Sequence, residues 1–262
     1  MTTTSLSAQA PETLAVDDTV YVSLIIDDLG DRFADGKRAL ALPGQITYGI
    51  LPFTPYATKL AALAQDAQKE IILHLPMQSE HGSHLGKGGL HEDMSPTEFN
   101  HALHASLAAV PNIRGVNNHM GSLLTQKPLI MARLMKALAA HHDLYFVDSV
   151  TTGNSQAQQM AEKFGIANTS SDIFLDNQRH TAALQQQWQA FLQHAKRKNG
   201  ALAIAHPYPE TLLFLKQALT QLEAEGVQLI NVSTYIQRQQ QRRLTWQTSS
   251  FPLPRAAKNS KP

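Results

Sequence analysis

The chain has 262 residues, of which 43% are hydrophobic, enough for one α/β domain with a sizeable core. Its formal net charge of +1 gives no reason to expect nucleic acid or another acidic polymer as a partner through bulk electrostatics. Because cysteine is absent, disulfides and thiolate zinc sites are excluded, and a metal would need histidine or carboxylate ligands. No apolar run approaches the length of a membrane span.

Residues 1–19 form a polar segment that we expect to be flexible. The segment lacks the basic start and long apolar core of a complete signal peptide, although residues 6–10 look like the small-residue end of one. A longer precursor that was trimmed is therefore one hypothesis for this end of the chain.

Residues 20–30 read VYVSLIIDDLG, an almost uninterrupted apolar run that ends in two adjacent carboxylates, Asp27 and Asp28. A short run so rich in β-branched residues predicts a strand buried on both faces, as at the centre of a parallel sheet. The two carboxylates repel each other, and a bound cation or a shared proton would relieve that repulsion. The alternative is that one Asp caps the following helix while the other is solvated.

Similar apolar runs recur along the chain and alternate with helical patterns, one of which begins with a capping box over residues 95–98. Eight candidate strands separated by helices predict a parallel α/β fold over residues 20–236. The further predicted strands are 45–51, 70–73, 113–116, 144–147, 173–175, 201–205 and 227–230.

Two segments depart from this alternation. Residues 75–94 form a long glycine-rich connection, whose histidines His81, His84 and His91 we interpret as part of a solvated loop rather than as substrate contacts. Residues 237–262 are rich in Gln, Arg, Lys, Ser and Pro, so we expect a polar, basic tail that is poorly ordered or loosely docked rather than a second domain.

Polar, chemically competent side chains follow nearly every predicted strand. The C-terminal ends of parallel strands are where active sites form in barrels and open sheets, whereas the opposite loops here have the composition of a solvated rim. This asymmetry predicts a functional site. The residues at these strand ends include Asp27, Asp28, His74, His119, Asp148, Asp176 and His206.

Asp28, His74 and His119 match the pattern of three protein ligands in an open catalytic site for zinc or a similar divalent cation. Such a cation lowers the pKa of water and generates a nucleophile near neutral pH. Asp27 would be placed to take the proton of that water, and His206 could protonate a leaving group.

Each of these assignments has an alternative. His74 and His206 could be buried structural histidines, and Asp176 is as consistent with a cap for the helix near Arg179 as with a ligand contact. Asp148 could orient His206 or stabilise its charged form. The motifs of dinucleotide, P-loop and serine-hydrolase sites are absent.

The strand ends together carry a set of motifs that resembles a known family. IIDDLG at 25–30, LHLPM at 73–77, GVNNHMGS at 115–122, FVDS at 146–149 and AHPYPETL at 205–212 look like the divergent polysaccharide deacetylases, a branch of the NodB-homology carbohydrate esterases. The resemblance runs from about residue 20 to about 236. It implies a distorted (β/α) barrel of about seven parallel strands and metal-dependent hydrolysis of acetyl groups on a polysaccharide.

The resemblance also implies roles for individual residues. Asp27 falls at the position of the base, Asp28 at that of a metal ligand and His206 at that of the acid. Classical members place two metal histidines in one H-x-x-x-H motif, but Leu123 stands four residues after His119. His74 is our candidate for the missing ligand. The expected substrate contacts are Asn118, Ser122 and Asp176.

The leading hypothesis is a deacetylase that uses a divalent metal, zinc being expected, and acts on a glycan in the periplasm or cell envelope. A competing hypothesis, favoured by Leu123, is a glycan-binding or envelope-assembly protein that keeps the barrel without turnover. A hydrolase of a C–N bond in a small molecule is a third option, because it would use the same site.

Overall fold

The computed structural model describes residues 19–141 and 143–250, and the apolar runs among them form one sheet of nine strands. All of the paired strands are parallel, as predicted. The strand β6 was not predicted, because its sequence Asn-Thr-Ser contains no apolar run. The strands are β1 Val20–Leu29, β2 Thr47–Ile50, β3 Glu70–Met77, β4 Gly115–Met120, β5 Tyr145–Asp148, β6 Asn168–Ser170, β7 Ile173–Phe174, β8 Ala201–Ala205 and β9 Val227–Leu229.

The sheet curls into a distorted barrel, which confirms the predicted fold class. Its strand order is β6-β5-β4-β3-β2-β1-β8-β7, so its two edge strands are consecutive in the chain. Between them, Ser171 donates its backbone N–H to Asp148 beside one edge, and Asp172 donates its own to Leu202 beside the other. These two residues therefore connect the two edges of the barrel where β6 and β7 do not pair.

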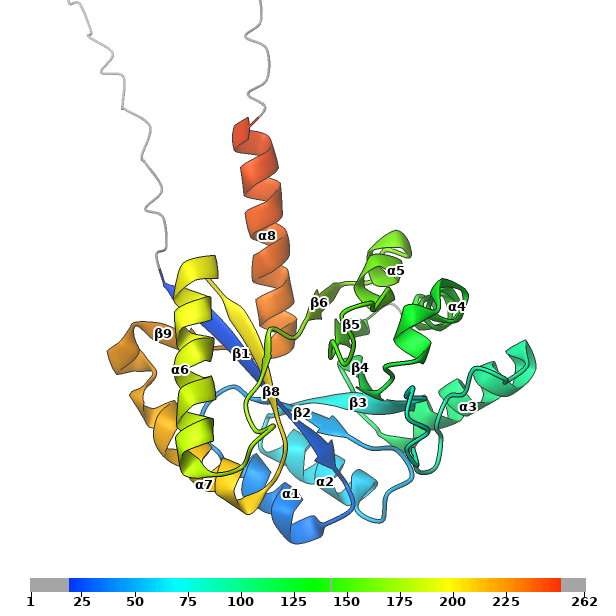
Figure 1. Ribbon diagram of the computed structural model, residues 1–262, viewed down its shortest axis with the longest axis horizontal. Helices are drawn as coiled ribbons and strands as arrows, with labels where there is room; N and C mark the ends of the chain where they lie inside the picture. The colour runs from blue at the N-terminus through cyan, green and yellow to red at the C-terminus, as the bar shows by residue number, and fades with distance from the viewer. Residues whose placement is uncertain (1–18, 142, 251–262) are drawn as a thin grey trace, which may run out of the picture.

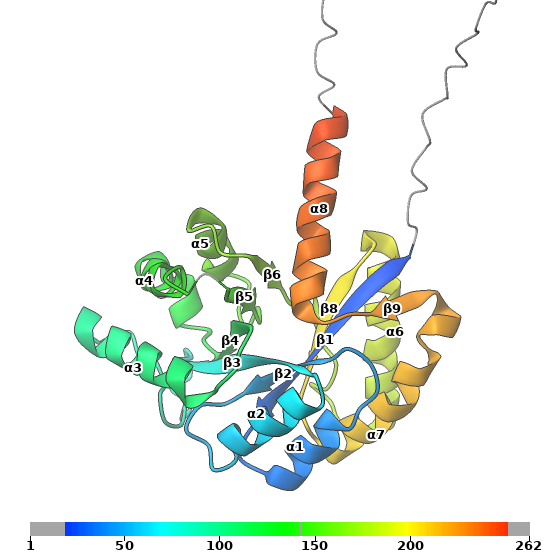
Figure 2. The ribbon, with the colours of Figure 1, turned by 180° about the vertical axis from the view of Figure 1, so that it is seen from behind.

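Strand β1 pairs with three other strands, β2, β8 and β9, which lie beside it in Figures 1 and 2. Val22 pairs with β8 on one edge and β9 on the other, whereas Ile25 pairs with β8 and β2. Strands β9 and β2 therefore follow one another along the same edge of β1. The side chains from Tyr21 to Asp27 are all buried, as expected for a strand covered on both faces.

Helices surround the outside of the curved sheet (Figures 1 and 2). The predicted capping box is present, since Ser95 Oγ accepts from Glu98 N over 3.3 Å and Glu98 Oε2 accepts from Ser95 N over 2.9 Å. The helices are α1 Phe33–Leu40, α2 Ala57–Asp66, α3 Pro96–Ala109, α4 Pro128–Leu138, α5 Ala157–Lys163, α6 Thr181–Lys198, α7 Pro209–Ala218 and α8 Val232–Ser250, with short 3-10 turns at Leu124–Gln126, Leu219–Gln221 and Glu223–Glu225.

Helix α8 crosses the expected boundary between residues 236 and 237 and stands away from the barrel in Figure 1. Its first turns are anchored by the buried side chains of Tyr235 and Ile236, and Arg243 pairs with Glu162 over 3.7 Å farther along. Residues 237–250 of the expected tail are thus helical, while residues 251–262 and 1–18 lie outside the described residues. Across the described chain, no helix combines the length and apolar character needed to cross a membrane.

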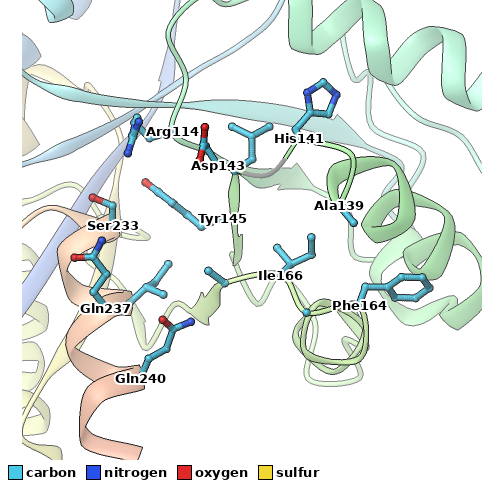
Figure 3. Close-up of a pocket in the computed structure, with 14 residues that line it drawn as sticks. Arg114, Ala139, His141, Asp143, Tyr145, Phe164, Ile166, Ser233, Gln237 and Gln240 are labelled. Atoms are coloured by element: carbon cyan, nitrogen blue, oxygen red, sulfur yellow. The ribbon is translucent and has the colours of Figure 1, made fainter. Parts of the chain in front are cut away.

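A cavity of about 470 Å³ separates the start of α8 from the N-terminal ends of β5 and β6 (Figure 3). Ser233, Gln237 and Gln240 of α8 form one wall, and Ile166 and Phe164 lie on the opposite side. This cavity lies at the N-terminal ends of the strands, away from the polar residues at their C-terminal ends.

Candidate metal centre

An irregularity at the end of β1 brings two consecutive carboxylates to one site. Successive side chains of a regular strand point to opposite faces, so Asp27 and Asp28 would be separated by the sheet. Instead, the pairing of β1 with β2 shifts between Ile26 and Leu29, and Asp28 has a φ of 58°. Such a conformation is uncommon for a residue other than glycine and tends to occur at functional sites.

The result is that both carboxylates contact the same imidazole. His74 on β3 has its Nδ1 atom 3.5 Å from Asp27 Oδ1 and its Nε2 atom 3.2 Å from Asp28 Oδ1. Strand β4 adds His119, whose Nδ1 lies 3.0 Å from Asp28 Oδ1 and 3.1 Å from His74 Nε2. The three predicted metal ligands therefore form a triangle of three potential donor atoms.

The dimensions of this triangle suit a tetrahedral cation site. Bonds of about 2.0 to 2.1 Å from zinc to nitrogen or oxygen separate neighbouring ligands by roughly 3.3 Å. Asp28 Oδ1 is buried and lies 3.0 and 3.2 Å from the two imidazole nitrogens without a hydrogen bond of good geometry, so a cation between the three atoms would satisfy it better. Among the described residues this is the one cluster of His, Asp and Glu groups close enough to hold a metal ion.

The electrostatics of the cluster also favour positive charge. Burial alone would raise the pKa of Asp28, but the imidazoles of His119 and His74 lower it well below its usual range. Burial alone would lower the pKa of His74, yet the two carboxylates beside it raise that pKa. A site that draws a proton to a buried imidazole in this way is suited to a divalent cation, which would take the place of that proton.

Asp27 differs from its neighbour in both environment and basicity. It is 1% exposed, and burial raises its pKa against the opposing effects of His74 and His206. The pKa values of the two adjacent carboxylates are therefore shifted in opposite directions, which is typical of a pair with different chemical roles. Asp28 stays ionised, whereas Asp27 is the stronger base.

Asn117 on β4 is a site residue that the sequence analysis did not single out. Its Nδ2 donates to Asp27 Oδ2 over 2.8 Å, and its Oδ1 lies 2.8 Å from His74 Nδ1. Because a side-chain amide oxygen can only accept, His74 carries its proton on Nδ1 and leaves Nε2 free to bind a cation. The first Asn of the NNHMGS motif was the available signal.

Gly49 on β2 is a second residue that prediction missed. A Cβ atom at this position would lie 1.9 Å from Asp27 Oδ1 and 3.3 Å from the Cβ of His74. Its φ is not in the left-handed region, so glycine is required here for space rather than for backbone conformation. The side chains of Asp27 and His74 occupy the volume that a larger residue would fill.

His206 lies beside the proposed ligands and is held by Asp176. Its Nδ1 lies 2.9 Å from Asp176 Oδ1, and its Nε2 lies 3.9 Å from Asp28 Oδ2. Burial alone would lower the pKa of His206, but Asp176 and then the two adjacent carboxylates raise it to about 9. The imidazole is therefore protonated at neutral pH.

Asp148 and Asp176 occupy different places from those expected. Asp148, predicted to orient His206, instead accepts from Ser155 Oγ over 2.6 Å and from Val150 N over 2.9 Å. Asp176, predicted as a substrate contact or helix cap, provides the carboxylate that binds His206, while His180 caps α6. The sequence did not reveal that Asp176, rather than Asp148, contacts His206. The contact arises because β7, which precedes Asp176, pairs directly with β8, which precedes His206.

The two expected substrate contacts on the NNHMGS motif are engaged within the protein. Asn118 is buried, accepts from Ser149 N over 2.9 Å and donates to Met120 O over 2.7 Å. Ser122 Oγ accepts from Glu80 N over 3.1 Å. These contacts hold the loop that follows His119.

Sequence comparison identifies relatives of this chain. Residues 24–236 match the profile of a family described as divergent polysaccharide deacetylase. An uncharacterized protein of Haemophilus influenzae is 35% identical over 211 residues, covering 80% of this chain and 75% of the relative. The uncharacterized protein YibQ of Escherichia coli is 33% identical over 219 residues, covering 84% of this chain and 68% of the relative.

Solved structures share the fold at low sequence identity. The uncharacterized protein ATU2773 of Agrobacterium tumefaciens superposes with a TM-score of 0.79 at 20% identity, over 83% of this chain and 89% of the other. The peptidoglycan deacetylase PdaC of Bacillus subtilis has a TM-score of 0.54 at 12% identity, over 90% and 100%. BA3943, a CE4 family pseudoenzyme of Bacillus anthracis, has a TM-score of 0.52 at 16% identity, over 83% and 66%.

Proposed function

The chain belongs to the divergent polysaccharide deacetylase family, and on that basis we propose that it is a metal-dependent hydrolase that removes acetyl groups from a polysaccharide of the cell envelope. The observation that carries this proposal is the triangle formed by Asp28, His74 and His119, with Asp27 and His206 beside it. A ligand set, a buried base and a charged acid at one site are the components that acyl hydrolysis requires.

Asp28, His74 and His119 would hold the cation, and their nitrogen and oxygen donors suit zinc. A divalent cation in this position supplies Lewis-acid polarisation of the acetyl carbonyl and makes water more acidic. Asn117 fixes the tautomer of His74, and a cavity lined by Asp28 and His119 would give a substrate access to these residues.

Asp27 serves as the general base. Its carboxylate is buried and held by Asn117, and its raised pKa makes it a better proton acceptor than an ordinary aspartate. It takes the proton of the attacking water as the carbon–oxygen bond to the acetyl carbonyl carbon forms. Gly49 leaves the space in which the Asp27 side chain lies.

His206 serves as the general acid. Because Asp176 accepts from Nδ1, the proton on Nε2 points to the side where Asp28 lies. That proton is transferred to the departing amine or alkoxide as its bond to the acetyl carbon breaks. Asp176 holds the imidazole in this orientation and stabilises its charge.

The alternative function is glycan binding or envelope assembly without turnover. The fold supports such a role, because a CE4 pseudoenzyme of Bacillus anthracis shares it. The position four residues after His119 is Leu123, which also agrees with a lost ligand, but His74 supplies a second imidazole at the site. That imidazole is the reason we favour hydrolysis.

The test is acetate release from N-acetylated chito-oligosaccharides and from acetylated peptidoglycan fragments. The purified chain is stripped with a chelator and assayed with and without added zinc, next to an Asp27→Asn variant that preserves size and loses the base. We expect the parent protein to release acetate in a zinc-dependent manner. The Asp27→Asn variant should release acetate at least about a hundredfold more slowly. Glycan binding without acetate release on any substrate would support the non-catalytic alternative and reject hydrolysis.

A further inference from the structure

A cavity of about 530 Å³ extends from the proposed metal centre to two loops on the barrel rim. Asp28 and His119 form its inner end. The loop after β2 and the glycine-rich loop after β3 form its two walls, and the lining residues used below are Phe53, His84, Gly86 and Lys87. An occupant of this cavity can therefore reach the metal ligands and contact both loops.

Phe53 is unusual among the residues of this cavity. Its side chain is 43% exposed, although large aromatic residues are normally buried, and its φ of 57° is an outlier for a bulky residue. Pro52 precedes it and Pro55 follows two residues later, so the loop has little backbone freedom. Both the exposure and the conformation carry an energetic cost, which is typical of residues retained for function.

The ring of Phe53 is held in place from behind by Gly88. A Cβ atom on Gly88 would lie 2.6 Å from Phe53 Cε2 and 2.9 Å from Cδ2, so the edge of the ring packs directly on the glycine backbone. Gly88 itself has a φ of 82°. A fixed aromatic ring that is packed along one edge and open to the cavity is a platform for a ligand.

The glycine-rich loop adds hydrogen-bond donors to this platform. His84 Nδ1 accepts from Gly86 N over 3.2 Å, so the neutral ring carries its proton on Nε2. The Lys87 ammonium provides three further donors in the same lining. An apolar ring together with donors matches a pyranose, whose C–H groups pack on the negative face of an aromatic ring while its hydroxyl and acetamide oxygens accept hydrogen bonds.

We propose that Phe53, with His84 and Lys87, forms a sugar-binding subsite that holds the pyranose ring next to the acetylated residue. The subsite selects a polymer over a small acetyl ester and sets which residue of the glycan reaches the ligands Asp28 and His119. This inference rests on the proposed function for the identity of the reacting group, whereas glycan binding at Phe53 requires no turnover.

The experiment distinguishes glycan binding at Phe53 from the proposed hydrolysis by comparing substrates with and without a sugar. Variants Phe53→Ala and Phe53→Gly remove the ring, and the glycine also relieves the left-handed backbone, so a fold defect would affect the two differently. Phe53→Trp keeps a platform, and Leu213→Ala removes a more exposed apolar side chain from α7, outside the cavity. Each zinc-loaded protein is assayed for hydrolysis of 4-nitrophenyl acetate and of an N-acetylated chito-oligosaccharide, and calorimetry measures binding of the oligosaccharide.

We expect both ring-deletion variants to weaken oligosaccharide binding and raise its KM by about threefold to tenfold, the usual worth of one aromatic contact. Hydrolysis of 4-nitrophenyl acetate should be unchanged, and the Trp and Leu213 variants should behave like the parent. Equal binding by all variants, loss of both activities together, or no oligosaccharide binding by the parent protein would overturn the subsite. If the parent binds the glycan through Phe53 but hydrolyses neither substrate, the subsite stands and the proposed hydrolysis fails.

Discussion

Asn117 donates a hydrogen bond from Nδ2 to Oδ2 of Asp27 over 2.8 Å, and both side chains are buried. The same amide meets His74 through its oxygen, so one side chain positions the proposed base and a proposed metal ligand. A single amide therefore contacts both Asp27 and His74.

Replacing Asn117 with Ala should lower kcat by about tenfold to a hundredfold with little change in KM, because the amide orients reacting groups and does not touch the glycan. Zinc affinity, measured by competition with a chromophoric chelator, should fall over a similar range, since His74 loses the partner that fixes its tautomer. Asn154→Ala is the matched surface control. Unchanged zinc affinity together with unchanged kcat would remove Asn117 from the site.

Replacing His206 with Ala should lower kcat by about a hundredfold to ten-thousandfold while the zinc content stays the same, because a general acid is lost and no ligand is lost. Asp176→Asn should have a smaller effect in the same direction, since a neutral amide no longer stabilises the charged imidazole.

The chain contains a matched control for this pair. His194 and Asp172 lie 3.2 Å apart at the other end of the strands, and variants of either residue should keep full activity. If Asp148→Asn reduced kcat more than Asp176→Asn, the orienting carboxylate would have been misassigned.

His119→Ala should abolish both bound zinc and acetate release, because it removes one of the three converging donors. Elemental analysis after exhaustive dialysis measures the metal directly. His101→Ala changes an exposed histidine of α3 and should bind as much zinc as the parent. Full zinc occupancy in the His119 variant would refute the ligand assignment.

Gly49→Ala should destabilise the protein by about 1 to 3 kcal/mol through overpacking and should also impair activity, because the new methyl group displaces Asp27. Thermal unfolding and kcat are the measurements. Gly153→Ala is the matched control, since its Cβ would meet nothing within 4 Å. A Gly49 variant with normal kcat would show that Asp27 tolerates displacement and does not act as the base.

Stability should fall at alkaline pH, partly because of Tyr235 at the start of α8. Burial, reinforced by Asp172, raises the pKa of Tyr235 to about 12, so the unfolded state loses the phenolic proton first. This contribution is fully present below pH of about 10 and is lost as pH rises through 12, amounting to at most about 3 kcal/mol. Urea unfolding of Tyr235→Phe across this range should show a shallower decline, and an identical slope would contradict the assignment.

The position of the site followed from the sequence through particular residues. The apolar run of β1 ends at Asp27 and Asp28, His74 and His119 lie in the C-terminal halves of β3 and β4, and His206 follows β8. Parallel strands bring their C-terminal ends to one rim, so polar residues at those ends had to be near one another. That local rule was sufficient to predict a parallel α/β fold, its polar rim and the convergence of Asp28, His74 and His119, whereas the barrel was implied by the family resemblance.

Pairwise contacts across the rim were not accessible in the same way. Asn117 and Asp27 are 90 positions apart, and Asp176 and His206 are 30 apart, so no local period or spacing connects them. The strand order decides which carboxylate faces which imidazole, and here it selects Asp176 over Asp148. From the strand ends alone, Asp148 and Asp176 are equivalent candidates, and only the order of the strands in the sheet distinguishes them.

The sequence by itself determined that two carboxylates and three imidazoles would meet at the C-terminal rim of a parallel sheet, because apolar periodicity specifies strands and their polar ends. Only the tertiary structure decided which contacts each of these side chains makes. The irregular end of β1 and the left-handed Asp28 turn both carboxylates to one side, and Gly49 leaves the space for Asp27. These are consequences of backbone geometry and packing volume, which depend on neighbours supplied by distant parts of the chain.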